Sequence, residues 1–180
     1  KEKFFSVGQF FEYSLQVGSP LFLYAMVYKS IYLERLLLLM KIAIALTFVC
    51  HGLYAVNFYP RPGIFVDMFL NTLGTSEETA HSLLFVAGLL DFIISLLIFL
   101  PYKCARPAMA YAVFWGLATA LARVTSFFDF SYAGESLYQW LHETVYRMPH
   151  FLIPLVAFIL MGYLMEESKL ESKSKSKYLR

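Results

Sequence analysis

Charged residues are scarce in this chain of 180 residues: Asp, Glu, Lys and Arg together make up 16% of it, and the formal net charge is only +2. The basic excess lies in the C-terminal tail, so there is no basic face on which nucleic acid could bind. Cysteine occurs only at Cys50 and Cys104, without a Cys-x-x-Cys pair, which argues against thiol–disulfide chemistry and a thiolate metal site. A phosphate-binding glycine loop and a nucleophile elbow are also missing. The chain therefore contains no complete catalytic motif.

Hydrophobic residues, by contrast, make up 59% of the chain, well above the roughly 45–50% that is usual in soluble folds. Three runs are apolar enough and long enough to supply the roughly 20 helical residues that cross a bilayer: residues 36–58, 82–100 and 107–128. A fourth run, residues 148–165, contains Pro154, so we expect it to span with a bend. These runs predict an integral membrane protein embedded in a lipid bilayer.

The chain divides into three parts by composition. Residues 1–35 form an N-terminal apolar segment, which either lies at the interface or spans as residues 10–28 if Glu12 and Gln16 sit at the interface. Residues 36–165 form the membrane bundle, and residues 166–180 form a charged, solvated cytoplasmic tail that is open to disorder. The predicted fold is all-α: a polytopic bundle of four core transmembrane helices, or five with the N-terminal one, plus a short amphipathic helix before the last span.

The distribution of Lys and Arg favours one orientation, because cytoplasmic segments are the more basic ones. Inside segments hold 10 Lys and Arg against 4 outside if the N-terminal segment spans, and 12 against 2 if it does not. Both versions place the C-terminus in the cytoplasm and the connections 57–80 and 129–147 outside. Within the first connection, residues 64–70 are expected to form a short interfacial helix that covers the outer end.

Ionisable residues in the predicted spans are few, and such residues usually face the interior of a bundle or a cavity. The predicted topology places every histidine toward the outer side, although the four lie in different segments. Arg123, Glu143 and Arg147 lie toward the same side. The histidines are His51, His81, His142 and His150. We therefore expect a group of polar side chains to converge at the outer end.

The segment before the fourth span has two faces at helical spacing. The apolar face carries Leu137, Leu141, Val145 and Met148, and the polar face carries Gln139, Glu143, Arg147 and His150. One interpretation is an interfacial helix with a wet polar face, on which Glu143 and Arg147 form an exposed ion pair. The other turns this face inward, so that Glu143, Arg147 and His150 meet His51 and Arg123. Such a pocket could hold a metal, a quinone head group or an anionic substrate.

A transition metal is one candidate cofactor for this pocket. His51, Glu143 and His150, with His142 beside them, have the donor types that bind zinc or non-haem iron. Their spacing is not diagnostic, because His142 and Glu143 begin His-Glu-x-x-x-Arg and not the His-Glu-x-x-His of zinc proteases. A nearby guanidinium also disfavours a bound cation.

Asp91 lies close to mid-bilayer, where a charge needs a partner. Small residues flank it on its own helix, and Arg123 lies at the end of a similar small stripe on the next span. One interpretation is a buried Asp91–Arg123 ion pair that locks the two helices together. The alternative is that the pair relays a proton or holds a substrate head group.

Several short motifs follow one another in a characteristic order across residues 36–128. They are Phe48-x-x-His-Gly52, Pro62-Gly-Ile-Phe-Val-Asp67 with Leu73-Gly74, Gly88-Leu-Leu-Asp91, and a basic turn from Lys103 to Pro107. In this order the features resemble the DoxX-like family of small bacterial membrane proteins. The resemblance implies a four-helix fold in the bacterial cytoplasmic (inner) membrane, with members tied to quinone-linked sulfur oxidation or to membrane redox and stress-related complexes. It also implies a role for Asp91, since family members commonly carry an acidic residue there.

The leading hypothesis is membrane redox chemistry at a quinone head group in an outward-facing polar pocket. Arg123 and His51 would hydrogen-bond the head group, Glu143 or His150 would exchange protons, and Asp91 would orient Arg123.

Two alternatives belong to other classes of function. One is a non-catalytic membrane subunit that scaffolds a larger complex of protein partners. The other is a small-solute or lipid transporter, which predicts a cavity that continues past Asp91 toward the cytoplasm. Arg147 and His142 complete the predicted binding residues, and the sequence leaves open whether the protein is an enzyme.

Overall fold

The computed structural model describes residues 7–28 and 31–178, with side chains as far as residue 174, and every regular element within them is a helix. The elements in chain order are α1 (Val7–Glu12), α2 (Ser14–Tyr28), α3 (Leu33–Ala55), α4 (Gly63–Leu73), α5 (Glu77–Leu97), α6 (Tyr102–Phe127), the 3-10 helix η1 (Phe130–Tyr132), α7 (Ala133–Arg147) and α8 (Pro149–Tyr178). The predicted all-α fold is confirmed.

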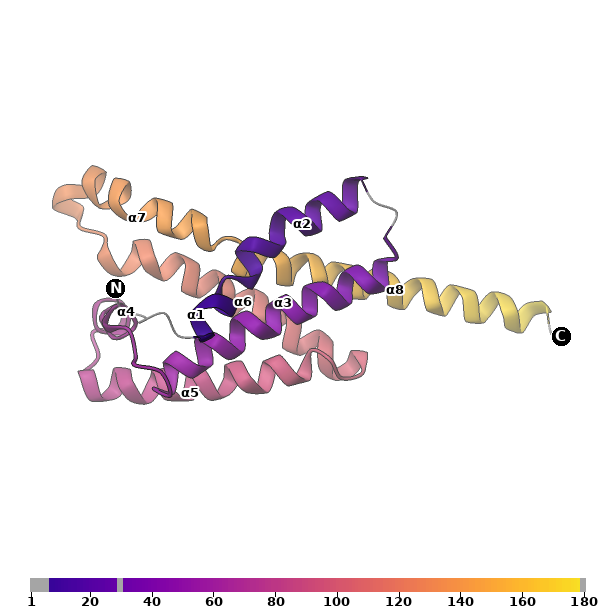
Figure 1. Ribbon diagram of the computed structural model, residues 1–180, viewed down its shortest axis with the longest axis horizontal. Coiled ribbons are helices and arrows are strands. Elements are labelled where there is room, and N and C mark those ends of the chain that lie inside the picture. The colour runs from indigo at the N-terminus through magenta and orange to yellow at the C-terminus, as the bar shows by residue number, and fades with distance from the viewer. Residues whose placement is uncertain (1–6, 29–30, 179–180) are drawn as a thin grey trace.

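Four helical stretches are long and apolar enough to cross a membrane. They are Leu33–Ala55, Glu77–Leu97, Tyr102–Phe127 and Phe130–Ser174, the last of which includes α7 and α8. Figure 1 shows that α3 and α6 run in one direction and α5 and α8 in the other. The chain is therefore a multi-pass membrane protein, as its apolar runs predict. We call the end where α3 finishes and α5 starts, which also carries α4 and α7, the α4 end (left in Figure 1), and the opposite end the tail end.

The span formed by α5 begins before the predicted residue 82. Ser76 caps it, because the Ser76 hydroxyl accepts a hydrogen bond from the Thr79 N–H at 3.3 Å. Glu77 and Glu78 occupy the first turn, where acidic side chains interact favourably with the helix dipole. A polar first turn thus extends an apolar span toward the α4 end.

The span formed by α6 also begins early, at Tyr102, so the turn predicted at residues 103–107 is wrong. These residues are helical, and the chain reverses before them. Arg106 packs on the bundle, with its guanidinium carbon 4.9 Å from the ring centroid of Phe158 in α8. This tertiary contact helps to stabilise a basic helix start that hydropathy alone does not reveal.

The N-terminal segment folds as two helices instead of one. The 15 residues of α2 reach only about 22 Å at 1.5 Å per residue, less than the roughly 30 Å of a hydrocarbon layer. Helix α1 packs against α3, and α2 packs against α3 and α8 with Leu15 and Phe22 buried in the core, while the end of α2 stands apart from the bundle (Figure 1). Of the predicted segment 1–35, residues 1–6 and 29–30 lie outside the described residues, and residues 33–35 already belong to α3.

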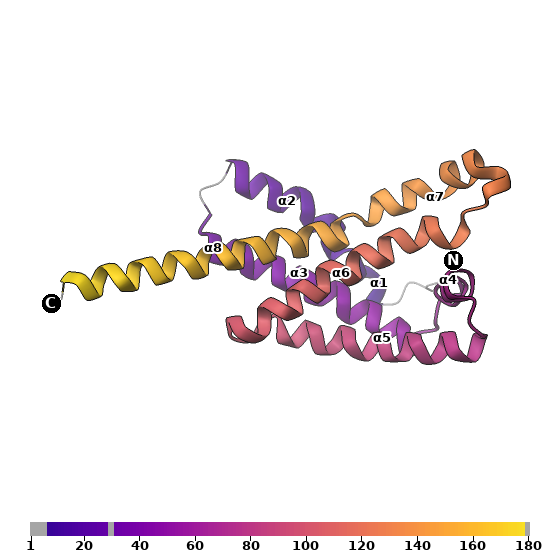
Figure 2. The ribbon, with the colours of Figure 1, turned by 180° about the vertical axis from the view of Figure 1, so that it is seen from behind.

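The charged tail continues α8 as a helix as far as Tyr178 and projects beyond the other helices (Figure 2). The sequence left disorder open here, because no apolar period follows residue 165. A helix forms because neither Gly nor Pro follows Gly162 and because Glu, Lys and Leu favour helix. Its side chains through residue 174 are exposed.

An apolar core fills the tail half of the bundle and includes Met40, Ile44, Ile98 and Met109, all almost fully buried. Toward the α4 end, α3 and α5 approach closely at two glycines. A Cβ added to Gly88 would lie 2.9 Å from the carbonyl oxygen of Gly52, so both positions need a residue without a side chain. The packed apolar core and these close contacts leave the remaining space of the bundle at its α4 end.

Candidate functional site

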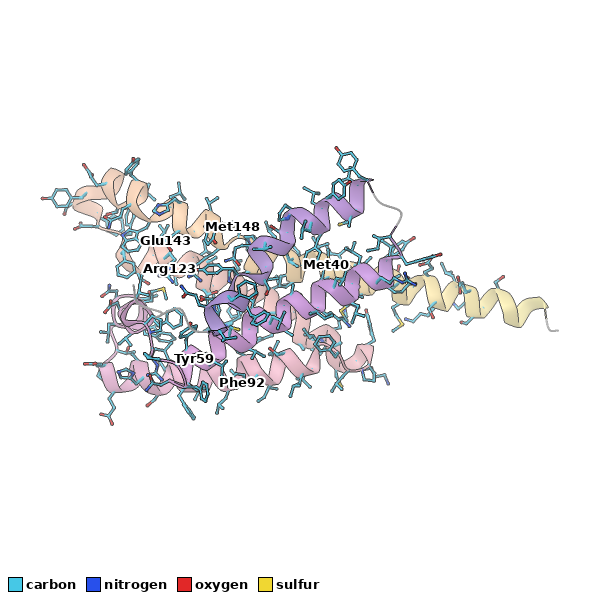
Figure 3. The ribbon with its side chains drawn as sticks, viewed as in Figure 1. Met40, Tyr59, Phe92, Arg123, Glu143 and Met148 are labelled. Carbon is cyan, nitrogen blue, oxygen red and sulfur yellow. The ribbon has the colours of Figure 1, made fainter. Side chains whose placement is uncertain are left out.

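Ionisable side chains gather at the α4 end. His51 lies near the end of α3, Arg123 near the end of α6 and His150 at the start of α8. Figure 3 shows Arg123 and Glu143 near this end, with Met40 farther toward the tail end. Helices that are antiparallel thus bring together residues that are far apart in the sequence.

A cavity of about 260 Å³ lies among these helices. Its walls are mainly apolar and include Phe65, Met68, Phe69, Leu84, Ala87 and Trp115. Its ionisable lining residues are His51, Asp91, Arg123 and Arg147. Apolar walls with a few convergent polar groups are typical of sites for small organic ligands, although this cavity is slightly smaller than the usual range of roughly 300–1,000 Å³.

The short helix α4 forms one wall of the cavity, in the place where a covering helix was predicted over residues 64–70. Gly74 ends α4 with φ of 61°, a left-handed conformation that favours glycine. The hydroxyls of Thr72 and Ser126 share a hydrogen bond of 2.6 Å, which ties α4 to α6. The wall is therefore held in place by polar contacts as well as by its aromatic side chains.

Beside the cavity, α1 supplies a carboxylate, Glu12, which was expected at the membrane interface if residues 10–28 span. Glu12 Oε1 lies 3.3 Å from His51 Nε2, and the Glu12 side chain is only 2% exposed. The rings of His51 and His150 are 5.2 Å apart between centroids. The signal for this burial was a single carboxylate flanked by Phe11 and Tyr13, but the sequence does not indicate its partner.

A glycine allows His150 to reach this position. A Cβ added to Gly116 of α6 would lie 2.1 Å from the His150 carbonyl oxygen, so the backbones of α6 and α8 meet only because Gly116 has none. His150 Nδ1 lies 3.1 Å from the carbonyl oxygen of Arg147. His150 is 3% exposed and faces a second cavity of about 10 Å³, which His51 and Asp91 also line.

Asp91 and Arg123 line the same cavity, but no ion pair within 4.0 Å joins them among the described residues. The predicted lock between the two helices is therefore wrong. Asp91 lines the small cavity together with Trp115 and Gly116 of α6, so it lies about level with these residues. Arg123 follows Gly116 on α6 and lies about 10 Å farther along the helix, at 1.5 Å per residue. The two side chains therefore line the same cavity at different depths.

The amphipathic helix α7 turns its apolar face outward. Leu137, Leu141 and Val145 are exposed, whereas Ser136 and Thr144 are buried against the bundle. This arrangement suits a helix whose outer surface meets lipid.

The polar stripe of α7 divides between cavity and surface. Arg147 lines the cavity, Glu143 is half-buried but does not line it, and His142 is exposed on the far side beside Tyr138. The predicted Glu143–Arg147 ion pair does not form within 4.0 Å. Of the polar residues predicted to meet, the structure thus brings Arg147 and His150 toward His51 and Arg123, and leaves Glu143 and His142 aside.

The described part of the chain contains no group of three or more His, Cys, Asp or Glu side chains that could hold a metal ion. The proposed ligands His51, Glu143 and His150 do not assemble, because Glu143 lies away from the two histidines' cavity. Cys50 is buried and Cys104 exposed, and the two do not form a disulfide.

His81 belongs to a separate cluster at the surface. Its Nε2 lies 3.6 Å from Glu77 Oε1, and its Nδ1 contacts the Arg61 guanidinium. Arg61 Nε also donates a hydrogen bond of 3.1 Å to the carbonyl oxygen of Ala55, at the end of α3. Partial burial lowers the pKa of Arg61. These contacts fasten the connection before α4 to the bundle and do not reach the cavity.

No family model, no curated protein and no solved structure matches this chain.

Proposed function

We propose that the chain is a DoxX-like protein of the bacterial cytoplasmic membrane that binds a quinone head group in the cavity and takes part in membrane redox chemistry. The observation that carries this proposal is the cavity of about 260 Å³, with aromatic walls and four ionisable groups, placed between helices apolar enough to span a bilayer. A quinone is a flat, apolar ring with acceptor oxygens at its edges, and it reaches such a site from the lipid. The motif resemblance supports the same chemistry.

The polar groups have different roles in this proposal. Arg123 and His51 donate hydrogen bonds to the quinone oxygens, and Arg147 adds positive charge at the same cavity. His51 exchanges protons, because its Nε2 lies against Glu12. Glu143 takes no part, since it does not line the cavity. Electrons pass to or from a separate redox partner in the membrane.

The proposed orientation places the α4 end outside and the tail in the cytoplasm. Its support is the excess of Lys and Arg in the segments at the tail end, including Lys103, Arg106, Lys169 and Lys173. Quinone would then bind in the outer half of the membrane.

Quinone binding can be measured through tryptophan fluorescence. The chain has two tryptophans: Trp115 lines the cavity, whereas Trp140 stacks on Phe127 at 4.3 Å between centroids. In a Trp140→Phe background, short-chain benzoquinone and naphthoquinone should quench Trp115 saturably in nanodiscs. Arg123→Met should weaken binding about tenfold, the loss of one charged hydrogen bond.

The matched control is Arg106→Met, which removes a guanidinium at the tail end. It should leave the quinone affinity unchanged. If neither quinone quenches Trp115 saturably, or if both Arg variants behave alike, the proposal is wrong.

A second candidate is a subunit that scaffolds a membrane complex. The projecting part of α8, which leaves its side chains through residue 174 exposed, favours it by offering an arm to a protein partner. Crosslinking from Lys169 in native membranes, followed by mass spectrometry, should identify a stable partner in that case. The transporter alternative is less well supported, because the packed core around Ile44, Ile98 and Met109 lies beyond Asp91.

A further inference from the structure

We propose that Asp91 is a specificity-determining residue at the floor of the cavity, where it donates a hydrogen bond from its neutral carboxylic acid to a carbonyl oxygen of the bound ligand. The site would thereby favour a ligand that places a carbonyl acceptor at this depth. This inference rests on the proposed function and adds to it the group that recognises the ligand's carbonyl.

The first step is the position of Asp91. It lies on α5, is 3% exposed, and lines both the main cavity and the small one beneath it. Its carboxyl group therefore stands where the two cavities adjoin, below the aromatic walls. A ligand that enters the main cavity with its ring inward reaches Asp91 last.

The second step is that the described part of the protein leaves one oxygen of this carboxyl group without a hydrogen bond. Asp91 Oδ1 is buried and has no hydrogen-bond partner among the described residues. Ser95 donates a hydrogen bond of 2.7 Å to the Asp91 backbone carbonyl and not to the side chain. A buried polar group without a partner costs about 1–3 kcal/mol, and a ligand that supplies a partner from outside the chain would remove that cost.

The third step concerns charge. No Lys, Arg or His forms an ion pair with Asp91 within 4.0 Å in the described part of the chain. An isolated carboxylate at mid-bilayer depth costs several kcal/mol, so Asp91 is held as the neutral acid. A neutral acid has one O–H donor, and no described residue accepts from it. The ligand must therefore present an acceptor, and a quinone carbonyl is an acceptor that an apolar, flat molecule can carry.

Infrared spectroscopy of bound quinone tests this hydrogen bond directly. Benzoquinone labelled with ¹³C at one carbonyl, and then at the other, is bound to wild type, Asp91→Asn and Asp91→Leu in nanodiscs. In wild type, the carbonyl nearer Asp91 should absorb at lower frequency than in alkane solvent. Asp91→Asn should retain a shift in the carbonyl frequency, because the amide N–H donates a hydrogen bond. Asp91→Leu should abolish the shift. The quinone affinity should fall about five- to tenfold in Asp91→Leu and stay within about twofold in Asp91→Asn, as expected for one neutral hydrogen bond.

Ser95→Ala is the control for a merely structural effect. It changes a buried polar residue one turn away and should leave both carbonyl bands unchanged. A second readout keeps the test independent of how well Asp91→Leu folds: the acid C=O stretch of Asp91, identified by its loss in Asp91→Asn, should move when quinone binds to wild type.

The outcomes separate the two proposals. If wild type binds no quinone, the proposed function fails and this inference fails with it. If wild type binds quinone but the Asp91 acid band does not move and the labelled carbonyl bands are the same in Asp91→Leu, only this inference is overturned.

Discussion

Replacing Gly116 by alanine tests the contact that forms the site. An added Cβ would lie 2.1 Å from the His150 carbonyl oxygen and 2.6 Å from its carbonyl carbon. Ordinary contact begins at 3.4 Å, so the backbones of α6 and α8 must separate by about 1.3 Å. Backbone atoms cannot rotate out of the way as a side chain can. Gly116→Ala should therefore displace His150 from its present position beside His51.

The expected cost follows from two opposing effects. Overpacking a tight contact costs typically 1–3 kcal/mol, and a backbone contact belongs at the upper end of that range. Alanine in place of a helical glycine returns about 0.8–1.0 kcal/mol. The net loss should be about 2 kcal/mol of unfolding free energy. At about 2–4 °C per kcal/mol for a chain of this size, the midpoint should fall by about 4–8 °C.

Gly162→Ala is the matched control. Like Gly116 in α6, Gly162 lies inside a helix, α8, but a Cβ added there meets nothing within 4 Å. It should leave stability unchanged or raise it by up to about 1 kcal/mol. Both variants are compared with wild type by thermal unfolding in the same detergent, and quinone binding is followed through Trp115. Equal midpoints for the two variants would refute the reasoning about the α6–α8 contact.

Two further predictions concern the buried pair and the orientation. Glu12→Leu should lower the unfolding free energy by roughly 1–3 kcal/mol, because it removes the buried carboxylate beside His51, which can then stay neutral; adding His51→Leu should recover part of this loss, and an additive double-mutant cycle would show that the pair does not interact. A membrane-impermeant maleimide should modify Cys104, which is exposed, and spare the buried Cys50. Modification in inverted vesicles and not in spheroplasts would place the start of α6 in the cytoplasm, whereas the opposite pattern would reverse the proposed orientation.

Hydropathy predicts the spans because a bilayer imposes a simple requirement on length and composition. The runs at 36–58 and 148–165 thus lie close to α3 and the apolar part of α8. The helix ends follow different rules. Ser76 extends α5 by capping it, and the tail of α8 is helical because nothing in its sequence ends the helix. Neither the cap nor the helix-favouring composition of the tail is apolar, so hydropathy predicts neither the start of α5 nor the end of α8.

The candidate site was harder to predict, because it depends on which helices touch. Gathering His51, Arg123 and Arg147 at one end follows from topology alone, since antiparallel spans place their ends together. The absence of Glu143 from the cavity lining does not follow from topology, because it depends on the rotation of α7 about its axis. Ser136 and Thr144 are the residues of α7 that pack against the bundle, and this rotation leaves Glu143 half-buried beside them.

Depth in the bundle explains which charges pair. A buried charge can be met only by a group at its own level, because a side chain reaches a few ångströms along a bundle whose helices rise 1.5 Å per residue. Glu12 finds His51 at its level, and the two pair at 3.3 Å. Asp91 lines the small cavity with Phe48, Trp115 and Gly116 and with two histidines, His51 and His150, but neither histidine forms an ion pair with it within 4.0 Å. The sequence pattern suggested Arg123 as the partner, but Arg123 lies about 10 Å beyond Gly116 along α6, at 1.5 Å per residue. The acid that the helices leave unsatisfied is thus the one whose partner must arrive with a ligand.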